Sequence, residues 1–188
     1  ILALPAPALA RLIVGAPGTQ ASLASLDHLA HPPVTSLFLG YRRDAVAHPL
    51  DGFGVLLPSI EKRRLLGVLF NSTLFPGRAP AGHVALTVML GGARHPELAG
   101  QPIEYQLPVV QQELADLLGV RGEPVIVRRT HWPRAIPQYQ LDHDAHLDVI
   151  RAAEHRHPGL HIGGPVRDGI GLPACLAAGQ RLAQAALN

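Results

Sequence analysis

The closing part of the chain constrains the fold more than any other part. A short apolar segment at 160–162 leads into a glycine-rich turn over 163–171, and the segment 172–187 that follows contains a single charge, Arg181. When that segment is drawn as a helix, its small and apolar side chains fall on one stripe. The stripe consists of Leu172, Cys175, Leu176, Gly179, Ala183 and Ala186. We therefore predict a strand, a turn and a helix that is largely buried against a sheet.

Composition excludes several classes of protein. The chain has 188 residues, 47% of them hydrophobic and 16% charged, which is typical of a folded protein and unlike a disordered one. A net charge of +2 does not indicate nucleic-acid binding. The single cysteine, Cys175, excludes an internal disulfide and a multi-cysteine zinc site. Because this cysteine content does not require an oxidising compartment, we expect a cytoplasmic protein. No apolar run reaches the ~18 residues that a membrane-spanning helix needs.

Hydrophobic periodicity predicts a mixed α/β (α+β) fold with an antiparallel sheet in the middle of the chain. Several short β-rich runs are separated by turn residues at hairpin spacing. The predicted strands are residues 1–4, 34–43, 52–57, 65–71, 83–91, 125–132 and 160–162. The predicted helices are 108–118, 142–156 and 172–187, and a further helix begins at Pro7. We place Pro108 at the start of its helix, where a missing amide proton costs little.

One glycine motif could contact a cofactor. Residues 169–174, GIGLPA, match the G-x-G-x-x-A form in which backbone amides approach a phosphate at a helix N-terminus. The motif does not follow its strand directly, and no acidic residue stands ~20 positions after it, so it is not a primary ADP-binding unit. The turn could place amides against an electron-rich cofactor edge, or it could be only a tight turn before a packing helix.

Two other clusters allow alternative functions. One could bind a metal ion or form the solvated first turn of a helix, and it consists of Asp142, His143, Asp144 and His146. The other could contact single-stranded nucleic acid, and it consists of Arg128, Arg129, His131, Trp132 and Arg134. Neighbouring residues of a strand point to opposite faces, which weakens the second alternative. The sequence contains no motif of a hydrolase or of phosphoryl transfer.

Four segments, taken in order, resemble those of the protoporphyrinogen oxidase family. They are DGFGVLLP at 51–58, LFPGR at 74–78, MLGG at 89–92 and IPQY at 136–139. The closing turn is also similar, and it contributes Gly163, Gly164, the segment 168–173 and Cys175. The resemblance extends over essentially the whole chain, but it covers only the carboxyl-terminal portion of the family.

The family consists of FAD enzymes that share a two-domain fold with the flavin amine oxidases. The resemblance therefore implies an antiparallel substrate-domain sheet with helices, together with the last strand, turn and helix of an FAD-binding domain. The implied activity is oxidation of protoporphyrinogen IX to protoporphyrin IX in haem biosynthesis, with molecular oxygen as acceptor and hydrogen peroxide as product. Orientation of the substrate against FAD would supply most of the catalysis, so we expect no catalytic side chain and no metal.

The family pattern also implies site residues. Beside the macrocycle it places Phe53, Gly54, Leu56 and Met89, a set that suits a flat apolar ring. Against FAD it places Trp132, Gly164, Pro165, Ile170, Gly171 and Leu172. The amides near Gly171 would face the pyrimidine edge of the flavin. The chain departs from the family at Pro165, which lacks an amide proton, and at Ala174, where the family generally has Asp.

The resemblance divides the chain into three segments. We expect residues 1–16 and 131–188 to belong to the FAD-binding domain and residues 17–130 to belong to the substrate-binding domain. The family's N-terminal glycine motif and its membrane-docking and propionate-binding segments have no counterpart here. We therefore expect a fragment that needs the missing N-terminal part of the same polypeptide to hold FAD. Peripheral association with the inner face of a membrane would depend on those other segments.

Three alternatives stay open. Oxidation of coproporphyrinogen III to coproporphyrin III differs from the implied reaction only in the peripheral carboxylates of the substrate. A non-catalytic fragment or scaffold would keep the sheet without redox chemistry. Amine or carotenoid oxidation on the same fold would need an aromatic cage or an elongated pocket in place of a wall formed by Phe53, Leu56 and Met89.

Overall fold

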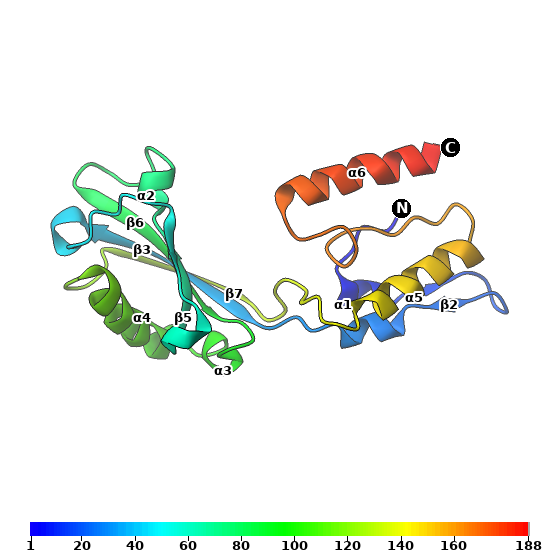
Figure 1. Ribbon diagram of the computed structural model, residues 1–188, viewed down its shortest axis with the longest axis horizontal. Helices are drawn as coiled ribbons and strands as arrows, with labels where there is room; N and C mark the ends of the chain where they lie inside the picture. Colours follow the sequence, from blue (N-terminus) through cyan, green and yellow to red (C-terminus); the bar gives the residue numbers. More distant parts are fainter. Residues whose placement is uncertain (188) are drawn as a thin grey trace. The chain divides into compact units, whose positions relative to one another are not determined.

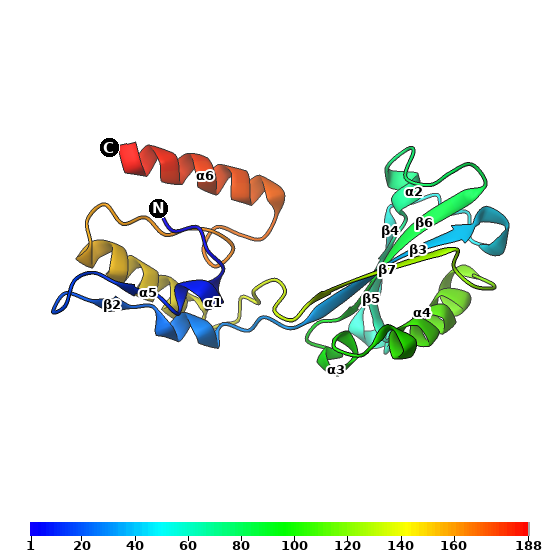
Figure 2. The same ribbon diagram turned by 180° about the vertical axis from the view of Figure 1, so that it is seen from behind.

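A computed structural model describes residues 1–187, and the chain forms two compact units (Figures 1 and 2). Unit 2 is one continuous segment, Pro32–Ala135, whereas unit 1 is formed by the two ends of the chain. The first boundary lies fifteen residues beyond the expected one at 16/17, because Leu23, Leu26 and Leu29 are buried in the core of unit 1. The second boundary lies at 135/136 instead of 130/131, because strand pairing continues through Trp132.

The predicted antiparallel sheet is confirmed in unit 2. Five strands pair in the order β4-β5-β6-β3-β7, and every pairing is antiparallel. The strands are β3 (Val34–Arg42), β4 (Gly54–Leu56), β5 (Leu65–Leu69), β6 (His83–Gly91) and β7 (Ile126–Trp132). The two nine-residue strands β3 and β6 pair along their whole length, so they form the centre of the sheet.

One face of this sheet is covered by the helix α4 (Ile103–Leu118) (Figure 1). Strand side chains alternate between the two faces, so Leu37, Leu39 and Tyr41 of β3 share the covered face and are fully buried. Leu114 of α4 belongs to the same hydrophobic core. Burial of these apolar surfaces is the main force that holds α4 on the sheet.

The helix α4 begins five residues before the predicted start, so Pro108 lies inside it rather than at its first turn. The buried Gln106 explains this difference. Its side-chain amide donates to the carbonyl oxygens of Leu98 and Ala99, at 2.9 Å each. These bonds fix the first turns of the helix and offset the backbone bond that Pro108 cannot make.

Several short elements complete unit 2. They are η2 (Arg43–Ala45), η3 (Ser59–Glu61), α2 (Asn71–Leu74) and α3 (Pro96–Ala99). The hairpin tip between β4 and β5 is attached to α4 through Glu113, which accepts from the backbone amide of Arg64 at 3.0 Å. Glu113 also pairs with the guanidinium of Arg63 at 3.2 Å. A polar anchor therefore links two elements that are far apart in the sequence.

Unit 1 contains two long helices and several short segments, and it has a small core of its own. Its elements are α1 (Ala6–Leu9), β1 (Ile13–Val14), β2 (Ala21–Ser22), η1 (Ala24–His28), α5 (His143–Arg156) and α6 (Leu172–Leu187). The helix α5 agrees with the prediction for 142–156. The predicted strands at 1–4 and 160–162 are wrong as strands, because a single parallel bridge between Leu2 and Ile162 is what the structure shows there.

The helix α6 has the predicted bounds, but the prediction that it is largely buried is wrong. Its buried residues are Ala178 and Leu182, which lie one turn apart and do not belong to the predicted stripe. Leu172, at the start of the predicted stripe, is 74% exposed. Ala178 and Leu182 pack against the rest of unit 1. The low charge of the segment 172–187 therefore did not identify which face of the helix is buried.

No helix within residues 1–187 is long and apolar enough to cross a membrane.

Candidate functional site

The face of the unit 2 sheet that α4 does not cover carries several exposed apolar side chains. The register places Leu56, Gly67, Met89, Ser36 and Thr130 side by side in one row across the sheet. It places Gly54, Leu69, Thr87, Phe38 and Arg128 in the next row. We call these two rows, together with Phe53, the outward wall.

Three of the predicted substrate residues supply the most exposed apolar surface of the outward wall. Phe53 is 70% exposed, Leu56 is 85% exposed and Met89 is 38% exposed. A cavity of about 370 Å³ opens beside them, and it is lined by Phe53, Gly54, Val55, Leu56 and Leu69. The structure therefore brings together Phe53, Gly54 and Leu56 at one cavity, with Met89 in the row of Leu56. A flat apolar molecule could cover this surface and remove it from water.

Gly54 has a reason to be glycine that does not depend on a ligand. A Cβ atom at this position would lie 2.2 Å from the carbonyl oxygen of Val68 on the neighbouring strand. Its φ angle of 153° also lies outside the range of ordinary side-chain-bearing residues. Pairing of β4 with β5 therefore requires the glycine, and this pairing holds Leu56 in place on the wall.

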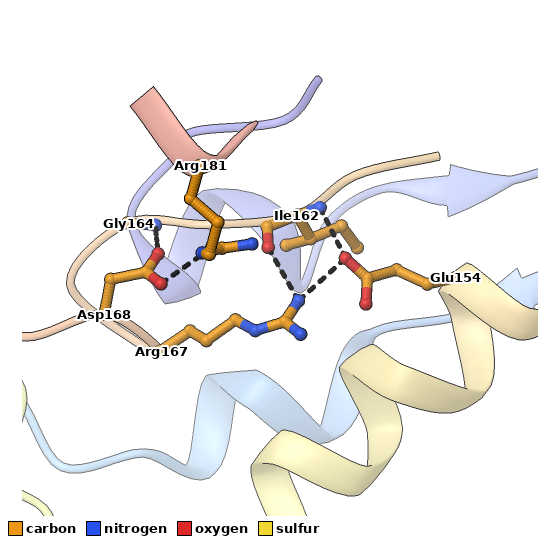
Figure 3. A network of polar contacts seen from close by, with 6 residues as sticks. All are labelled: Glu154, Ile162, Gly164, Arg167, Asp168 and Arg181. Atoms are coloured by element: carbon orange, nitrogen blue, oxygen red, sulfur yellow. Dashed lines mark hydrogen bonds and ion pairs between the residues drawn. The ribbon is translucent and has the colours of Figure 1, made fainter. Parts of the chain in front are cut away.

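The turn that leads into α6 is held by two acidic residues (Figure 3). Glu154 accepts from the amide of Ile162 at 2.8 Å and pairs with Arg167 at 2.7 Å. Asp168 accepts from the amide of Gly164 at 2.8 Å and pairs with Arg181 of α6 at 2.7 Å. All six residues come from unit 1, so they form a scaffold that fixes the turn to both α5 and α6.

This scaffold decides which of the predicted cofactor residues are free to bind. The amide of Gly164 is already used by Asp168, and Pro165 has no amide proton. The carbonyl oxygen of Pro165 accepts from the hydroxyl of Tyr139. Burial raises the pKa of Tyr139, so the hydroxyl keeps its proton and continues to donate. Gly164 and Pro165 therefore shape the turn through contacts within the protein.

The start of α6 presents backbone amides beside exposed apolar side chains. The first amides of a helix have no partner inside it, and they carry the positive end of the helix dipole. The first turn of α6 contains no acidic residue that would compete for these amides. Ile170 and Leu172, on either side of Gly171, are 47% and 74% exposed. Exposed apolar side chains beside free amides suit a ring system with an electron-rich edge.

Trp132, the remaining predicted cofactor residue, belongs to unit 2. It is the last residue of β7, and it lies opposite Val34 of β3 on the same face as the outward wall. The side chain is 45% exposed. Its assignment to the cofactor stays a prediction, as do the assignments of all the other site residues.

Sequence reasoning missed several residues of the outward wall. Phe38 and Leu69 contribute apolar surface, and Arg128 contributes a charge at the edge strand. Strand alternation could have placed Phe38 on the face opposite Leu37, but the alignment of β3 with β7 is needed to bring Arg128 into its row. The sequence therefore shows which residues of a strand share a face, but it does not show which residues of two strands lie opposite each other.

The two alternative clusters do not form the predicted arrangements. The rings of His143 and His146 lie 6.1 Å apart between centroids, and no three potential metal ligands gather anywhere in residues 1–187. The basic run of β7 is divided between two faces. Arg129 turns to the helix-covered side and donates to the side chain of Gln106 at 2.9 Å, whereas Arg128 lies on the outward wall.

Comparison with known proteins defines the class. The chain belongs to the family of flavin containing amine oxidoreductases, whose sequence pattern matches residues 1–187. More particularly, it is 34% identical to protoporphyrinogen oxidase 2, chloroplastic/mitochondrial, of Arabidopsis thaliana over 174 residues, which are 91% of this chain and 34% of the relative. It is 35% identical to the mitochondrial protoporphyrinogen oxidase of Nicotiana tabacum, over 86% of this chain and 33% of the relative. The family predicted from the sequence is confirmed.

A more distant relative and a solved structure extend the comparison. Coproporphyrinogen III oxidase of Bacillus subtilis is 24% identical over 92% of this chain and 38% of the relative. A crystal structure from Exiguobacterium sp. 255-15 superimposes with a TM-score of 0.80 at 22% identity, over 99% of this chain and 40% of that chain. This match confirms the predicted fold class. The chain spans about a third of the length of the two plant relatives.

Proposed function

We propose that this chain forms part of an FAD-dependent oxidase that converts protoporphyrinogen IX to protoporphyrin IX, with molecular oxygen as the electron acceptor. The observation that carries the proposal is the outward wall, where Phe53, Leu56 and Met89 expose apolar surface on one face of a sheet. A flat macrocycle is the kind of substrate that such a surface can bind. The identity with two protoporphyrinogen oxidases over most of this chain supports the same substrate.

The residues of this chain would position the macrocycle and shield it from water. They would not exchange protons with it. Phe53 and Leu56 would contact one face of the macrocycle and exclude water from it. The only charged side chain in the two rows of the wall is Arg128, so no carboxylate or histidine stands there as a general base. The chemistry that FAD would supply when bound is acceptance of a hydride from a carbon of the macrocycle. The amides at Gly171 and Leu172 would stabilise negative charge at the cofactor edge.

Other contacts would come from polypeptide outside this chain. The relatives are about three times as long as the matched part, and the free amides of α6 can hold only one edge of a dinucleotide cofactor. We propose that another part of the same protein completes the sites for FAD and for the substrate carboxylates. The cytoplasmic location and peripheral membrane association stay predictions.

Coproporphyrinogen III is the alternative substrate. The Bacillus subtilis relative carries this activity in its name, but its identity to this chain is lower than that of the two plant proteins. Protoporphyrinogen IX is therefore the substrate that we favour. Steady-state oxidation of both compounds by the complete gene product will decide, because the preferred substrate will have the higher kcat/KM.

The test of the wall is the substitution Leu56→Asp in the complete gene product. A carboxylate on the wall would be buried without a partner under the macrocycle, so we expect kcat/KM for protoporphyrinogen to fall about tenfold or more. The rate is measured from the absorbance of the conjugated porphyrin. Because Leu56 is 85% exposed, its replacement should leave the melting temperature unchanged.

The matched control is Ile60→Asp, since Ile60 has a similar apolar side chain that is 82% exposed and lies in η3, outside the wall. This variant should oxidise the substrate at the rate of the wild type. A Leu56→Asp protein that is folded and as active as the control would contradict the proposed function.

A further inference from the structure

Two adjacent arginines of β7 have opposite environments. Arg129 donates to the side-chain oxygen of Gln106 at 2.9 Å and to the backbone oxygens of Ala99 and Gln101 at 3.3 and 3.1 Å. Arg128 lies on the outward wall and is exposed, and its one hydrogen bond within the described chain goes to the carbonyl oxygen of its own neighbour, Val127, at 3.0 Å. The guanidinium of Arg129 is thus held by the fold, whereas that of Arg128 keeps most of its donors free.

The position of Arg128 relative to the apolar residues is set by the register of the sheet. Arg128 lies opposite Phe38, which lies opposite Thr87, and the row continues to Leu69 and Gly54. Three strand spacings, about 14 Å, separate the backbone of Arg128 from that of Leu69. This distance is on the scale of a tetrapyrrole with its side chains. A ring that covers Leu69 and Thr87 would therefore place its rim near the long Arg128 side chain.

The charge distribution on this face suits a ligand that carries negative charge at its periphery. Among the residues that the register places on the outward face from Trp132 to Ile126, Arg128 is the one charged side chain. A porphyrinogen has an apolar ring and carboxylates at its periphery, so it matches a wall with one cation at the border. A guanidinium can bind a carboxylate through two parallel hydrogen bonds, which fix direction as well as attraction.

We propose that Arg128 binds a peripheral carboxylate of the tetrapyrrole and thereby sets the orientation of the ring on the outward wall. This inference rests on the proposed function, because it requires that the macrocycle occupies the wall. It assigns to Arg128 a role in substrate specificity: the residue recognises the number and position of carboxylates, whereas the apolar residues recognise the ring. The alternative is that Arg128 only protects the edge strand β7 from aggregation, in which case it would not affect substrate specificity.

The test uses two ligands that differ only in charge. Protoporphyrin IX, the stable product of the proposed reaction, and its dimethyl ester, in which both carboxylates are neutralised, are titrated into the complete gene product and followed by porphyrin absorbance. We expect Arg128→Gln to raise the Kd for protoporphyrin IX about fivefold at low salt, with a smaller effect at high salt. The Kd for the ester should stay unchanged, and Arg128→Lys should restore part of the affinity.

The matched control is Arg121→Gln, because Arg121 is another exposed arginine of unit 2 and lies outside the wall. It should bind both ligands as the wild type does. If Arg128→Gln binds protoporphyrin IX as tightly as the wild type, the role of Arg128 is overturned and the outward wall stands. If the wild type binds neither porphyrin, both this inference and the proposed function are overturned. The role of Arg128 would also be overturned if Arg128→Gln lost binding to a single-stranded oligonucleotide and kept its binding to protoporphyrin IX.

Discussion

At the scale of single residues, strand alternation decides what each side chain can do. Thr35, Leu37, Leu39 and Tyr41 occupy alternate positions of β3 and are all fully buried. The predicted strand 34–43 is enough to explain this shared face, because every second residue of a strand points to the same side. The sequence could not predict how each buried polar group is satisfied. The hydroxyl of Thr35 donates to the carbonyl oxygen of Ala99 at 2.7 Å, which is a contact over 64 residues of sequence.

Tyr41 supports a prediction about pH. Burial, with a smaller effect from Glu123, raises the pKa of Tyr41 to about 12, above its ordinary value of 10.0. The contribution of the neutral phenol to stability is therefore complete below pH 10 and is lost as the pH rises towards 12. Since its hydroxyl has no hydrogen-bond partner within residues 1–187, Tyr41→Phe should change the free energy of unfolding at pH 7 by less than about 1 kcal/mol.

The same substitution should reduce the loss of stability between pH 10 and 12, as measured by urea unfolding at several pH values. Tyr105→Phe is the control, because Tyr105 is 68% exposed and its replacement should leave the alkaline loss unchanged. If Tyr41→Phe lost as much stability between pH 10 and 12 as the wild type, ionisation of Tyr41 would not be the cause of that loss.

At the scale of elements, the sequence predicts where helices and strands begin and end better than it predicts what their side chains contact. The residues of β6 and α6 form a strand and a helix with the predicted limits, because local periodicity and the glycines at their ends determine them. The buried face of α6 was predicted wrongly, since the packing of Ala178 and Leu182 depends on residues distant in the sequence. The early start of α4 has the same origin, because Gln106 bonds to the end of α3.

The attachment of α4 to the hairpin tip gives a prediction at this scale. Glu113 is 8% exposed and accepts from the amide of Arg64, so Glu113→Ala would leave a partly buried donor without its partner. We expect the free energy of unfolding to fall by about 1–3 kcal/mol in urea titrations. Glu113→Gln keeps a side-chain oxygen for this amide and should lose less. Equal losses in the two variants would show that the hydrogen bond is not what stabilises the contact.

At the scale of the whole molecule, the two units are built differently along the chain. Unit 2 is continuous and has its own core, which includes Leu37, Leu86 and Leu114. Unit 1 needs both ends of the chain, because Leu23 and Leu26 pack in one cluster with Ile150. The division into an FAD-binding and a substrate-binding domain stays a prediction. The boundaries of the two compact units depend on packing and strand pairing that no local pattern reveals.

Continuity predicts that residues 32–135 fold in isolation. Their core is contained within the segment, so this fragment should give a dispersed NMR spectrum and one cooperative unfolding transition. The control is the fragment 136–187, which lacks Leu23 and Leu26 and should not fold cooperatively. An unfolded 32–135 fragment would show that unit 2 depends on contacts outside its own segment.

The sequence by itself determined the family, the strands of the sheet, most helices and the apolar character of Phe53, Leu56 and Met89. These features depend on residue types and on local spacing, which are fully present in a linear chain. The tertiary structure decided which side chains share a surface. Pairing of β7 with β3 brings Arg128 to the outward wall, Asp168 occupies the amide of Gly164, and α6 buries Ala178. Such contacts join positions distant in the sequence, and therefore they exist only once the chain is folded.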